Sequence, residues 1–515
     1  MDSIIGGMLL AASPEALIAV FVGLIAGQIL GAVPGLTASM AVALLVPYTY
    51  YLDPWIGIPM LLGMFKGSLF GSSITAILVK TPGAPAAAAT VLDGYPLAQQ
   101  GKGGKAMKMA LYSSVFGDAF SDICLILAAG ALAAIALHFG PPEYMLLTAF
   151  SLVTLSALSG RSLWKGLVAV LLGMGIGMIG LDPIAATPRL TFGSLELEEG
   201  IGLIPMLIGM LAVSEALRQM EQPLHKLARQ TVSFSTKRAD NRISWPEFRR
   251  CLPTLAKSSG MGTLIGAMPG LGATVAAFLA YGEAKRASKQ PENFGKGEIE
   301  GVAAAEAANN AVSGSNMIPL LAFGIPGDIA AALIMGAFLI QGITLGPVVF
   351  QENPIEIYAI FTALLIANFF NLILGHGLIR MARRVVAVPK RLLFPAVLVI
   401  ASAGAYALRG SVFDIQLVFL FGLLGYAMGK LAIPTVPLLI GFILMPILEE
   451  NFRITLLLAS SHDLNLGFVL QRPAFLSLLA IMGLAAFLLI RRRRAFRMAG
   501  APTLAARPQT EKAEP

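Results

Sequence analysis

The chain is dominated by apolar stretches that are long enough to cross a lipid bilayer. The clearest of them fall near 14–30, 55–79, 105–137 and 355–379. Only 13% of the residues are Asp, Glu, Lys or Arg, about half the share that a soluble domain carries. Since a spanning helix needs about 20 mostly apolar residues, the sequence predicts an all-α, polytopic membrane protein with about 12 transmembrane helices plus re-entrant or broken helices.

The formal net charge of +8 does not indicate a nucleic-acid partner, because the basic residues lie in short connecting segments and in the tail. The positive-inside rule places such segments in the cytoplasm. Two cysteines and four scattered histidines form neither a disulfide framework nor a metal-binding pattern. We therefore expect no nucleic acid, no cofactor and no metal other than a transient Na⁺. The N-terminus lacks the features of a cleaved signal peptide, so the first apolar stretch is expected to be retained.

The two halves of the chain resemble each other. Gly31-Ala-Val-Pro-Gly-Leu36 recurs as Gly266-Ala-Met-Pro-Gly-Leu271, and two downstream pairs and one later motif recur in the same order: Gly71-Ser72 with Gly314-Ser315, Pro82-Gly83 with Pro326-Gly327, and Pro205 to Gly209 with Pro437 to Gly441. Loops at corresponding positions differ in charge, since 97–108 is rich in lysine and 346–354 has no Lys or Arg. Opposite charge bias predicts opposite sides of the membrane, and hence two inverted-topology repeats.

This pattern divides the chain into five parts. We expect a first transmembrane repeat at 1–218, a cytoplasmic basic linker at 219–250 and a second transmembrane repeat at 251–472. A final transmembrane helix at 473–491 and a disordered cytoplasmic tail at 492–515 follow. A multi-pass location in a bacterial inner membrane fits this organisation.

Each repeat contains two Pro-Gly pairs that are expected to break helices. In a bilayer, broken backbone survives where it is buried in protein or lines a watery cavity, where free N–H groups suit an anion and free carbonyls suit a cation. The alternative is that the glycines only allow close helix packing. The candidate substrate and ion ligands are Pro34, Gly35, Thr37, Ser39, Gly71, Ser72, Ser73, Thr75, Pro82, Gly83, Pro269, Gly270, Thr274, Glu306, Asn309, Asn310, Gly314, Ser315, Pro326 and Gly327.

Ionisable residues inside apolar stretches are costly and call for a functional hypothesis. For Glu306 we favour ion coupling or a role in site structure over a helix-capping or interface role. Asp118 and Asp122, one turn apart, are candidates for ion coupling or for an interhelical hydrogen-bond pair, with Asn368 and Asn371 in the second repeat. Lys66 and Lys80 could neutralise an anionic substrate, although for Lys66 the preferred interpretation is a side chain that snorkels to the membrane interface.

At these motifs the sequence resembles the large membrane subunit of the tripartite tricarboxylate transporters, the TctA family. The matching stretches are Gly31 to Thr37, Phe70 to Leu78, Thr81 to Pro85, Thr90 to Pro96, Glu300 to Val302, Glu306 to Asn310, Ile318 to Leu321 and Gly324 to Gly327. They cover nearly the whole chain in order. Ser72 departs from a Gly-Gly-Ser pattern of the family, and Asp328 stands where a small residue is commoner.

The resemblance implies a secondary transporter that imports tricarboxylates or related carboxylates on a Na⁺ or H⁺ gradient. It also implies two partners, a small four-helix membrane subunit and a periplasmic solute-binding protein. A stand-alone ion-coupled transporter or a passive channel for small anions is the alternative. An intramembrane aspartyl protease using Asp118 and Asp328 is disfavoured because no paired Tyr-Asp context occurs, and we expect no enzyme activity. No G-x-x-x-x-G-K-[ST] loop for ATP is present.

Overall fold

The computed structural model describes residues 2–158, 162–221, 235, 237–386, 390–460, 466–480 and 482–483. It divides into two compact units, the first formed by 1–138 and 151–447 and the second by 139–150 and 448–515. Part of the predicted linker and the whole predicted tail lie outside the described residues. The predicted final helix is described mainly over 473–480, which is helical.

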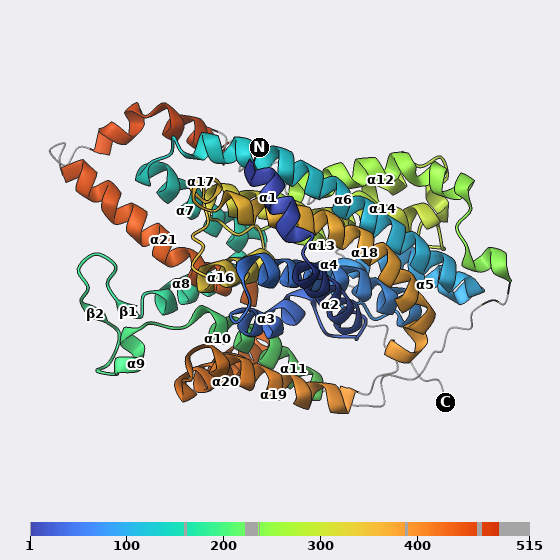
Figure 1. The fold of residues 1–515 in the computed structure, drawn as a ribbon, viewed down its shortest axis with the longest axis horizontal. Helices are drawn as coiled ribbons and strands as arrows, with labels where there is room; N and C mark the ends of the chain where they lie inside the picture. The colour runs from blue at the N-terminus through green and yellow to red at the C-terminus, as the bar shows by residue number, and fades with distance from the viewer. Residues whose placement is uncertain are drawn as a thin grey trace. The chain divides into compact units, whose positions relative to one another are not determined.

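Figure 1 shows the elements of the first half, of which α2 and α4 end just before the predicted breaks. They are α1 (Asp2–Ala11), α2 (Pro14–Gly31), α3 (Ala38–Thr49), α4 (Pro54–Val79), η1 (Pro85–Ala87), α5 (Ala88–Leu97), η2 (Ala98–Lys102), α6 (Gly103–Ala136), α7 (Pro141–Leu158), α8 (Leu163–Gly177), β1 (Gly180–Leu181), β2 (Pro188–Arg189), α9 (Leu195–Glu198), α10 (Leu203–Ile208), η3 (Gly209–Val213) and α11 (Ser214–Met220). The two short strands pair antiparallel, with Gly180 opposite Arg189.

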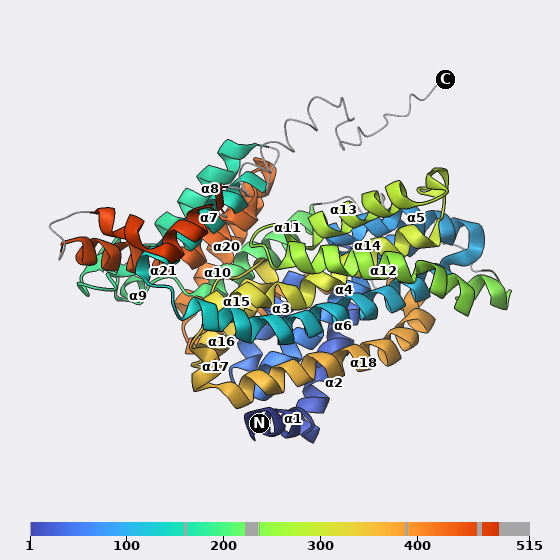
Figure 2. The ribbon, with the colours of Figure 1, turned by 90° about the horizontal axis from the view of Figure 1, so that it is seen from above.

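The elements of the second half are again almost entirely helical. They are η5 (Arg238–Asn241), α12 (Trp245–Gly266), α13 (Gly272–Ala287), η6 (Pro291–Asn293), α14 (Ile299–Ser315), α15 (Met317–Phe323), α16 (Ile329–Ile340), α17 (Val349–Glu352), α18 (Pro354–Val386), α19 (Lys390–Arg409), α20 (Val412–Lys430), α21 (Thr435–Ser460) and η7 (Leu466–Gln471). Figure 2 shows α6, α12, α14 and α18 running alongside one another. The all-α prediction is confirmed.

The apolar helices fall into long ones that can span a bilayer and shorter ones. Within the described residues, 7 helices or helix runs are long and apolar enough to span a bilayer. Several other predicted crossings are apolar helices of only 10–17 residues, such as α3, α8 and α16. Such lengths fall short of the roughly 20 residues that a simple span needs. The expected re-entrant and broken pieces have this character, and the count of about 12 crossings stays a prediction.

Glycine spacing brings α2 and α4 into backbone contact along their whole shared length. A Cβ atom added to Gly23, Gly27 or Gly31 of α2 would lie 2.1–2.3 Å from a main-chain carbonyl oxygen of α4. The reverse holds for Gly63, Gly67 and Gly71 of α4, where the distances to carbonyl oxygens of α2 are 2.5–2.8 Å. Small residues at intervals of four are the usual means of close helix packing in membranes. These glycines therefore allow close packing of α2 on α4, and the predicted ligand role of Gly71 stays a prediction.

The helices that follow the four breaks pack across the two halves in a reciprocal way. α3, after the first break of the first half, contacts α16, after the second break of the second half. η1 and α5, after the second break of the first half, contact α13, after the first break of the second half. Exchange of partners in this manner is what a two-fold related pair of repeats requires. Their inverted orientation across a membrane stays a prediction.

An ion pair between a buried carboxylate and a partly exposed arginine lies within the second unit. The Glu143 side chain is fully buried and accepts from Arg472 Nε at 2.6 Å and from the Gly140 main-chain N–H at 2.8 Å. Arg453 pairs with Glu449 one turn away at 2.9 Å. Because a buried carboxylate is strongly destabilising without a partner, Arg472 is important for the stability of this unit.

Candidate functional site

All four predicted Pro-Gly pairs lie between helices. Pro34 and Gly35 separate α2 from α3, and Pro269 and Gly270 separate α12 from α13. Gly35 and Gly270 have φ angles of 94° and 91°, a region that favours glycine. The first pair of breaks therefore requires glycine for the backbone conformation, as expected from the sequence.

The second pair of breaks requires glycine for a different reason. Gly83 and Gly327 have ordinary negative φ, but each lies against the first break of its own half. A Cβ at Gly83 would lie 2.5 Å from the Gly31 carbonyl oxygen, and a Cβ at Gly327 would lie 3.1 Å from the Gly266 carbonyl oxygen. In addition, Gly270 N–H donates to the Gly327 carbonyl at 2.8 Å. In each half the two breaks thus form one compact backbone cluster.

The helix starts at these clusters differ in how their N–H groups are used. Thr37 Oγ1 accepts from Met40 N–H at the start of α3, and Asp328 accepts from Ala331 N–H at 2.9 Å at the start of α16. The start of α13 at Gly272 has no side-chain cap, and residues 269–275 are half-exposed. An uncapped helix start leaves free donors and a positive dipole end, which favour an anion. Asp328 already places a carboxylate at α16, which makes that end less suited to an anionic ligand.

Most hydroxyls predicted beside the breaks donate within their own helices. Ser72 Oγ donates to the Leu69 carbonyl at 2.7 Å, and Thr75 Oγ1 donates to the Ser72 carbonyl at 3.0 Å. Ser315 Oγ donates to the Ala311 carbonyl at 2.8 Å and lies against Gly266. Ser39 and Thr274 are half-exposed near the starts of α3 and α13. These groups surround the breaks, and their role as ligands stays a prediction.

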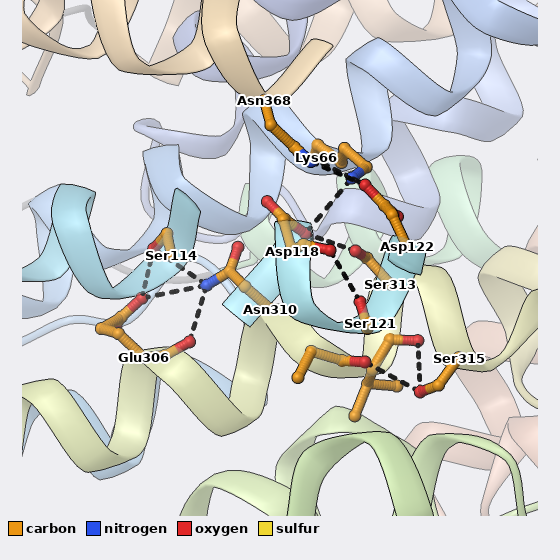
Figure 3. A network of polar contacts seen from close by, with 12 residues as sticks. Lys66, Ser114, Asp118, Ser121, Asp122, Glu306, Asn310, Ser313, Ser315 and Asn368 are labelled. Atoms are coloured by element: carbon orange, nitrogen blue, oxygen red, sulfur yellow. Dashed lines mark hydrogen bonds and ion pairs between the residues drawn. The ribbon is translucent and has the colours of Figure 1, made fainter. Parts of the chain in front are cut away.

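Glu306 lies in a fully buried network that joins four helices, and Figure 3 shows the part of it that contains Ser114 and Asn310. Its Oε1 accepts from Ser73 Oγ of α4 at 2.6 Å and from Thr90 Oγ1 of α5. Its Oε2 accepts from Ser114 Oγ of α6 at 3.2 Å and from Asn310 Nδ2 at 3.4 Å. These donors explain how a carboxylate without a cationic neighbour is accommodated. Thr90 and Ser114 were missed as candidates from the sequence, since nothing in their local pattern marks them.

A second buried network lies further along α6 and contains Lys66. Lys66 Nζ donates to Asp122 Oδ2 at 2.6 Å and to Asn368 Oδ1 at 2.8 Å, and lies 3.7 Å from Asp118 Oδ1. Only 1% of the Lys66 side chain is exposed. The preferred interpretation of Lys66 as a snorkelling lysine is wrong, because the residue lies midway along α4 with both carboxylates beside it. Lys80, in contrast, is exposed and lies over the Tyr95 ring.

The predicted pairing of the aspartates with the second repeat is found in part. Asn368 Nδ2 donates to Asp122 Oδ2 at 2.7 Å. Asn371 instead accepts from Gln28 Nε2 of α2 at 2.8 Å. Asp118 accepts from Ser313 Oγ of α14, whereas Asp328 is engaged with Asn316 at 2.9 Å. The two aspartates of the disfavoured protease hypothesis therefore belong to different networks.

The asparagines of α14 and its end have buried polar atoms without a hydrogen-bond partner in the described protein. They are both amide atoms of Asn309, and the Oδ1 atoms of Asn310 and Asn316. Leaving such an atom unpaired costs about 1–3 kcal/mol. Buried unpaired groups in a native structure call for an explanation such as a bound water or ion. Asn309 and Asn310 were predicted as ligands, and Asn316 lies at the packed second break.

Asp93 connects the two halves and was missed as a structural residue. Its Oδ1 accepts from the main-chain N–H groups of Gly295, Gly297 and Glu298 at 2.8–2.9 Å, and its Oδ2 accepts from Tyr281 Oη at 2.9 Å. A single carboxylate thus fixes the loop that leads into α14. Because α14 carries Glu306 and the asparagines, Asp93 positions the polar face of the site.

Within the described residues, no group of three or more His, Cys, Asp or Glu side chains is arranged to hold a metal ion. The candidate site consists of paired helix breaks, the helix starts of η1 and α13 without a side-chain cap, buried amides and two buried acidic networks. This combination can accommodate an anion beside free N–H groups and a small cation beside carboxylates and carbonyls.

Comparison with known proteins agrees with these features. A protein of Agrobacterium vitis described as "Uncharacterized 52.8 kDa protein in TAR-I ttuC' 3'region" is 35% identical over 92% of this chain and 93% of its own length. A second protein of that organism, described as "Uncharacterized protein in TAR-II ttuC' 3'region", is 42% identical over 37% of this chain and 79% of its own length. No solved structure matches the chain. The model of the tripartite tricarboxylate transporter TctA family matches residues 17–440, and the chain therefore belongs to that family.

Proposed function

We propose that the chain is the large transmembrane subunit of a binding-protein-dependent secondary transporter in a bacterial inner membrane. It imports a tricarboxylate or a related carboxylate and is driven by a Na⁺ or H⁺ gradient. Its partners are a small four-helix membrane subunit and a periplasmic solute-binding protein. Family membership supports a tricarboxylate transporter subunit, and the remaining features are our proposal.

One observation carries the proposal. Each half contains two helix breaks that pack on each other, and the helices that follow these breaks pack on the corresponding helices of the other half. Transporters built from repeats bind their substrate at such discontinuous helices near the repeat interface. The free N–H groups at the start of α13 suit a carboxylate. The unpaired amide of Asn309 supplies a donor and an acceptor, and the unpaired Oδ1 of Asn310 supplies a second acceptor. A polyanionic substrate matches these donors better than a neutral solute does.

The proposal is tested by uptake into proteoliposomes that contain this subunit, the small subunit and the binding protein. Radiolabelled citrate and a panel of other tri-, di- and monocarboxylates are offered under an imposed Na⁺ or H⁺ gradient. We expect accumulation of at least one carboxylate above its equilibrium level, dependent on the binding protein and on one gradient. Absence of uptake of every carboxylate, with correctly inserted protein, would refute the substrate class.

A passive channel for small anions is the alternative. The buried Lys66, Asp118 and Asp122 network argues for ion coupling, because an open pore has no need of costly ionisable groups packed inside its helices. The same assay separates the two. A channel would bring the labelled anion only to equilibrium with the membrane potential, whichever ion gradient is imposed.

A further inference from the structure

Three ionisable side chains meet at the interface of α4, α6 and α18, and all three are buried. Lys66, Asp118 and Asp122 are each no more than 1% exposed. Figure 3 shows the Lys66 ammonium beside both carboxylates, with the Asn368 amide on the same side. We call these residues and two of their hydrogen-bond partners the lysine–aspartate cluster, which consists of Lys66, Asp118, Asp122, Asn368 and Ser313.

The charges of this cluster do not cancel. With all three groups ionised, two carboxylates and one ammonium leave a net charge of −1 in a fully buried position. An uncompensated buried charge is strongly unfavourable. One oxygen of each carboxylate, Asp118 Oδ2 and Asp122 Oδ1, is buried without a hydrogen-bond partner. The cluster therefore lacks one positive charge and offers oxygen atoms to receive it.

The geometry favours a proton over a metal ion as the missing charge. A metal ion between the unpaired oxygens would lie beside the Lys66 ammonium, which is within 3.7 Å of both carboxylates, and would be repelled by it. It would also need several further oxygen ligands, whereas a proton needs a single carboxylate oxygen. Asp122 Oδ2 already accepts hydrogen bonds from Lys66 and Asn368. The Lys66 ammonium lies farther from Asp118, at 3.7 Å, so the negative charge of Asp118 is the less compensated of the two. The proton adds to Asp118, and no other bond forms or breaks.

Few other ionisable groups face the cluster among the described residues. On α4 and α6 the ionisable groups that face the cluster are Lys66, Asp118 and Asp122 themselves. α14 contributes Glu306, whose hydrogen-bond network reaches Ser114, one turn before Asp118. α18 contributes Asn368 directly, while its His376 contacts Tyr112 at 3.2 Å further along. The charge state of the cluster is thus determined mainly by its own three groups.

The cluster is connected to a predicted substrate break through α14. Ser313 donates to Asp118, and the next residue, Gly314, packs so closely on Asp122 that a Cβ would lie 2.6 Å from its Oδ1. Ser315 in turn packs on Gly266, which precedes the break at Pro269 and Gly270. A change in the charge of Asp118 therefore acts on residues 313–315 of α14. This segment packs on Gly266, which lies three residues before Pro269.

We propose that the lysine–aspartate cluster is a proton-binding site that couples carboxylate import to the proton gradient, with Asp118 as the proton carrier and Lys66 as the fixed counter-charge. The coupling role rests on the proposed transport function. Binding of the proton itself does not, and it is tested separately.

The first experiment measures proton binding without substrate. Infrared difference spectra between high and low pH are recorded for the purified chain in lipid nanodiscs without Na⁺. We expect a band of a buried protonated carboxyl group that titrates with pH, is lost in Asp118→Asn and is kept in Asp414→Asn. Asp414 is a matched control, since it is 1% exposed and paired with Arg409 outside the cluster. A band unchanged in Asp118→Asn would overturn the proposal, as would a band that Na⁺ abolishes by competing for the site.

The second experiment measures coupling in the reconstituted system. Asp118→Asn imitates the neutral carboxyl group, so exchange of labelled for unlabelled carboxylate should continue while accumulation driven by a proton gradient is lost. Asp414→Asn should keep both. Proton-driven accumulation that survives in Asp118→Asn would overturn the coupling role. If the wild type imports no carboxylate but the titrating band depends on Asp118, the proposed function fails and the proton site stands.

Discussion

Replacement of Gly83 by alanine is the sharpest test of the packed breaks. In the folded protein the new methyl group would lie 2.5 Å from the Gly31 carbonyl oxygen and 3.1 Å from both Ser72 Cα and Cβ. Two of these neighbours are backbone atoms, so no side-chain rotation can relieve the contact. The break between α4 and α5 must move away from the end of α2.

The expected cost follows from two opposing effects. Overpacking a tight interior costs about 1–3 kcal/mol, and the reduced freedom of the unfolded chain returns about 0.4–1 kcal/mol. The net destabilisation for Gly83→Ala is therefore at most about 2.6 kcal/mol, with a central value of about 1.3 kcal/mol. Gly327→Ala should cost less, because its nearest contacts are 3.0–3.1 Å. Gly175→Ala, in α8 with no atom within 4 Å, should stabilise by up to about 1 kcal/mol.

Thermal unfolding of the three purified variants in the same lipid or detergent checks the order. We expect the midpoint to fall most in Gly83→Ala, less in Gly327→Ala, and to rise or stay level in Gly175→Ala. Uptake should fall in the first two only. If Gly83→Ala and Gly175→Ala unfold at the same temperature, the close approach of the two breaks is not present in the protein.

Three further substitutions test other parts of the account. Lys66→Met removes the cation beside two buried carboxylates and should destabilise by about 3–5 kcal/mol. The double variant with Asp122→Asn should recover part of this loss in a thermal double-mutant cycle, and no recovery would contradict the pairing. Asp93→Asn should cost about 1–3 kcal/mol and speed amide hydrogen exchange in 295–298, and unchanged exchange would contradict its anchoring role. At the start of α12, outside the predicted spans, burial alone would raise the pKa of Glu247, but Lys105 and the Ser244 hydrogen bonds lower it from 4.5 to about 2. Its contribution to stability should be constant above pH 4.5 and lost as the pH falls towards 2, so the difference in unfolding midpoint between wild type and Glu247→Gln should shrink only in that range.

The helix breaks could be predicted from the sequence because their cause is local. Proline removes a donor and glycine tolerates positive φ wherever they occur, and Gly35 and Gly270 adopt that conformation. The close approach of Gly83 to Gly31 has no such local signal, since it depends on how α4 returns to α2. The positions of the breaks could therefore be predicted from the sequence, but the reason for the second glycine in each half could not.

The buried networks could be predicted only one residue at a time. Glu306, Asp118 and Asp122 stand out as ionisable residues in apolar stretches, but their partners come from several helices. Ser73, Thr90 and Ser114 are common residue types, and only the packing of α4, α5 and α6 brings them to Glu306. The snorkelling interpretation of Lys66 is wrong for a reason that the sequence contains, since the residue lies midway along the apolar stretch 55–79 and far from either end.

The number of crossings and the inverted orientation stay predictions, because both depend on how the helices insert into the membrane. Apolar helices such as α3 and α16 have 12 residues each, too short for a simple span and long enough for a re-entrant piece. Which side of the membrane each loop faces depends on insertion, for which loop charge supplies the prediction.

The most direct test of the account is carboxylate uptake by variants of the breaks in the fully reconstituted system. Pro34→Ala, Pro269→Ala and Pro326→Ala are compared with Leu127→Ala and Leu171→Ala, whose side chains are exposed on apolar helices. We predict that the proline variants insert normally but lose gradient-driven uptake, while the leucine variants transport at the wild-type rate. Equal uptake in both sets, or equal loss in both sets, would contradict the claim that the paired breaks form the transport site.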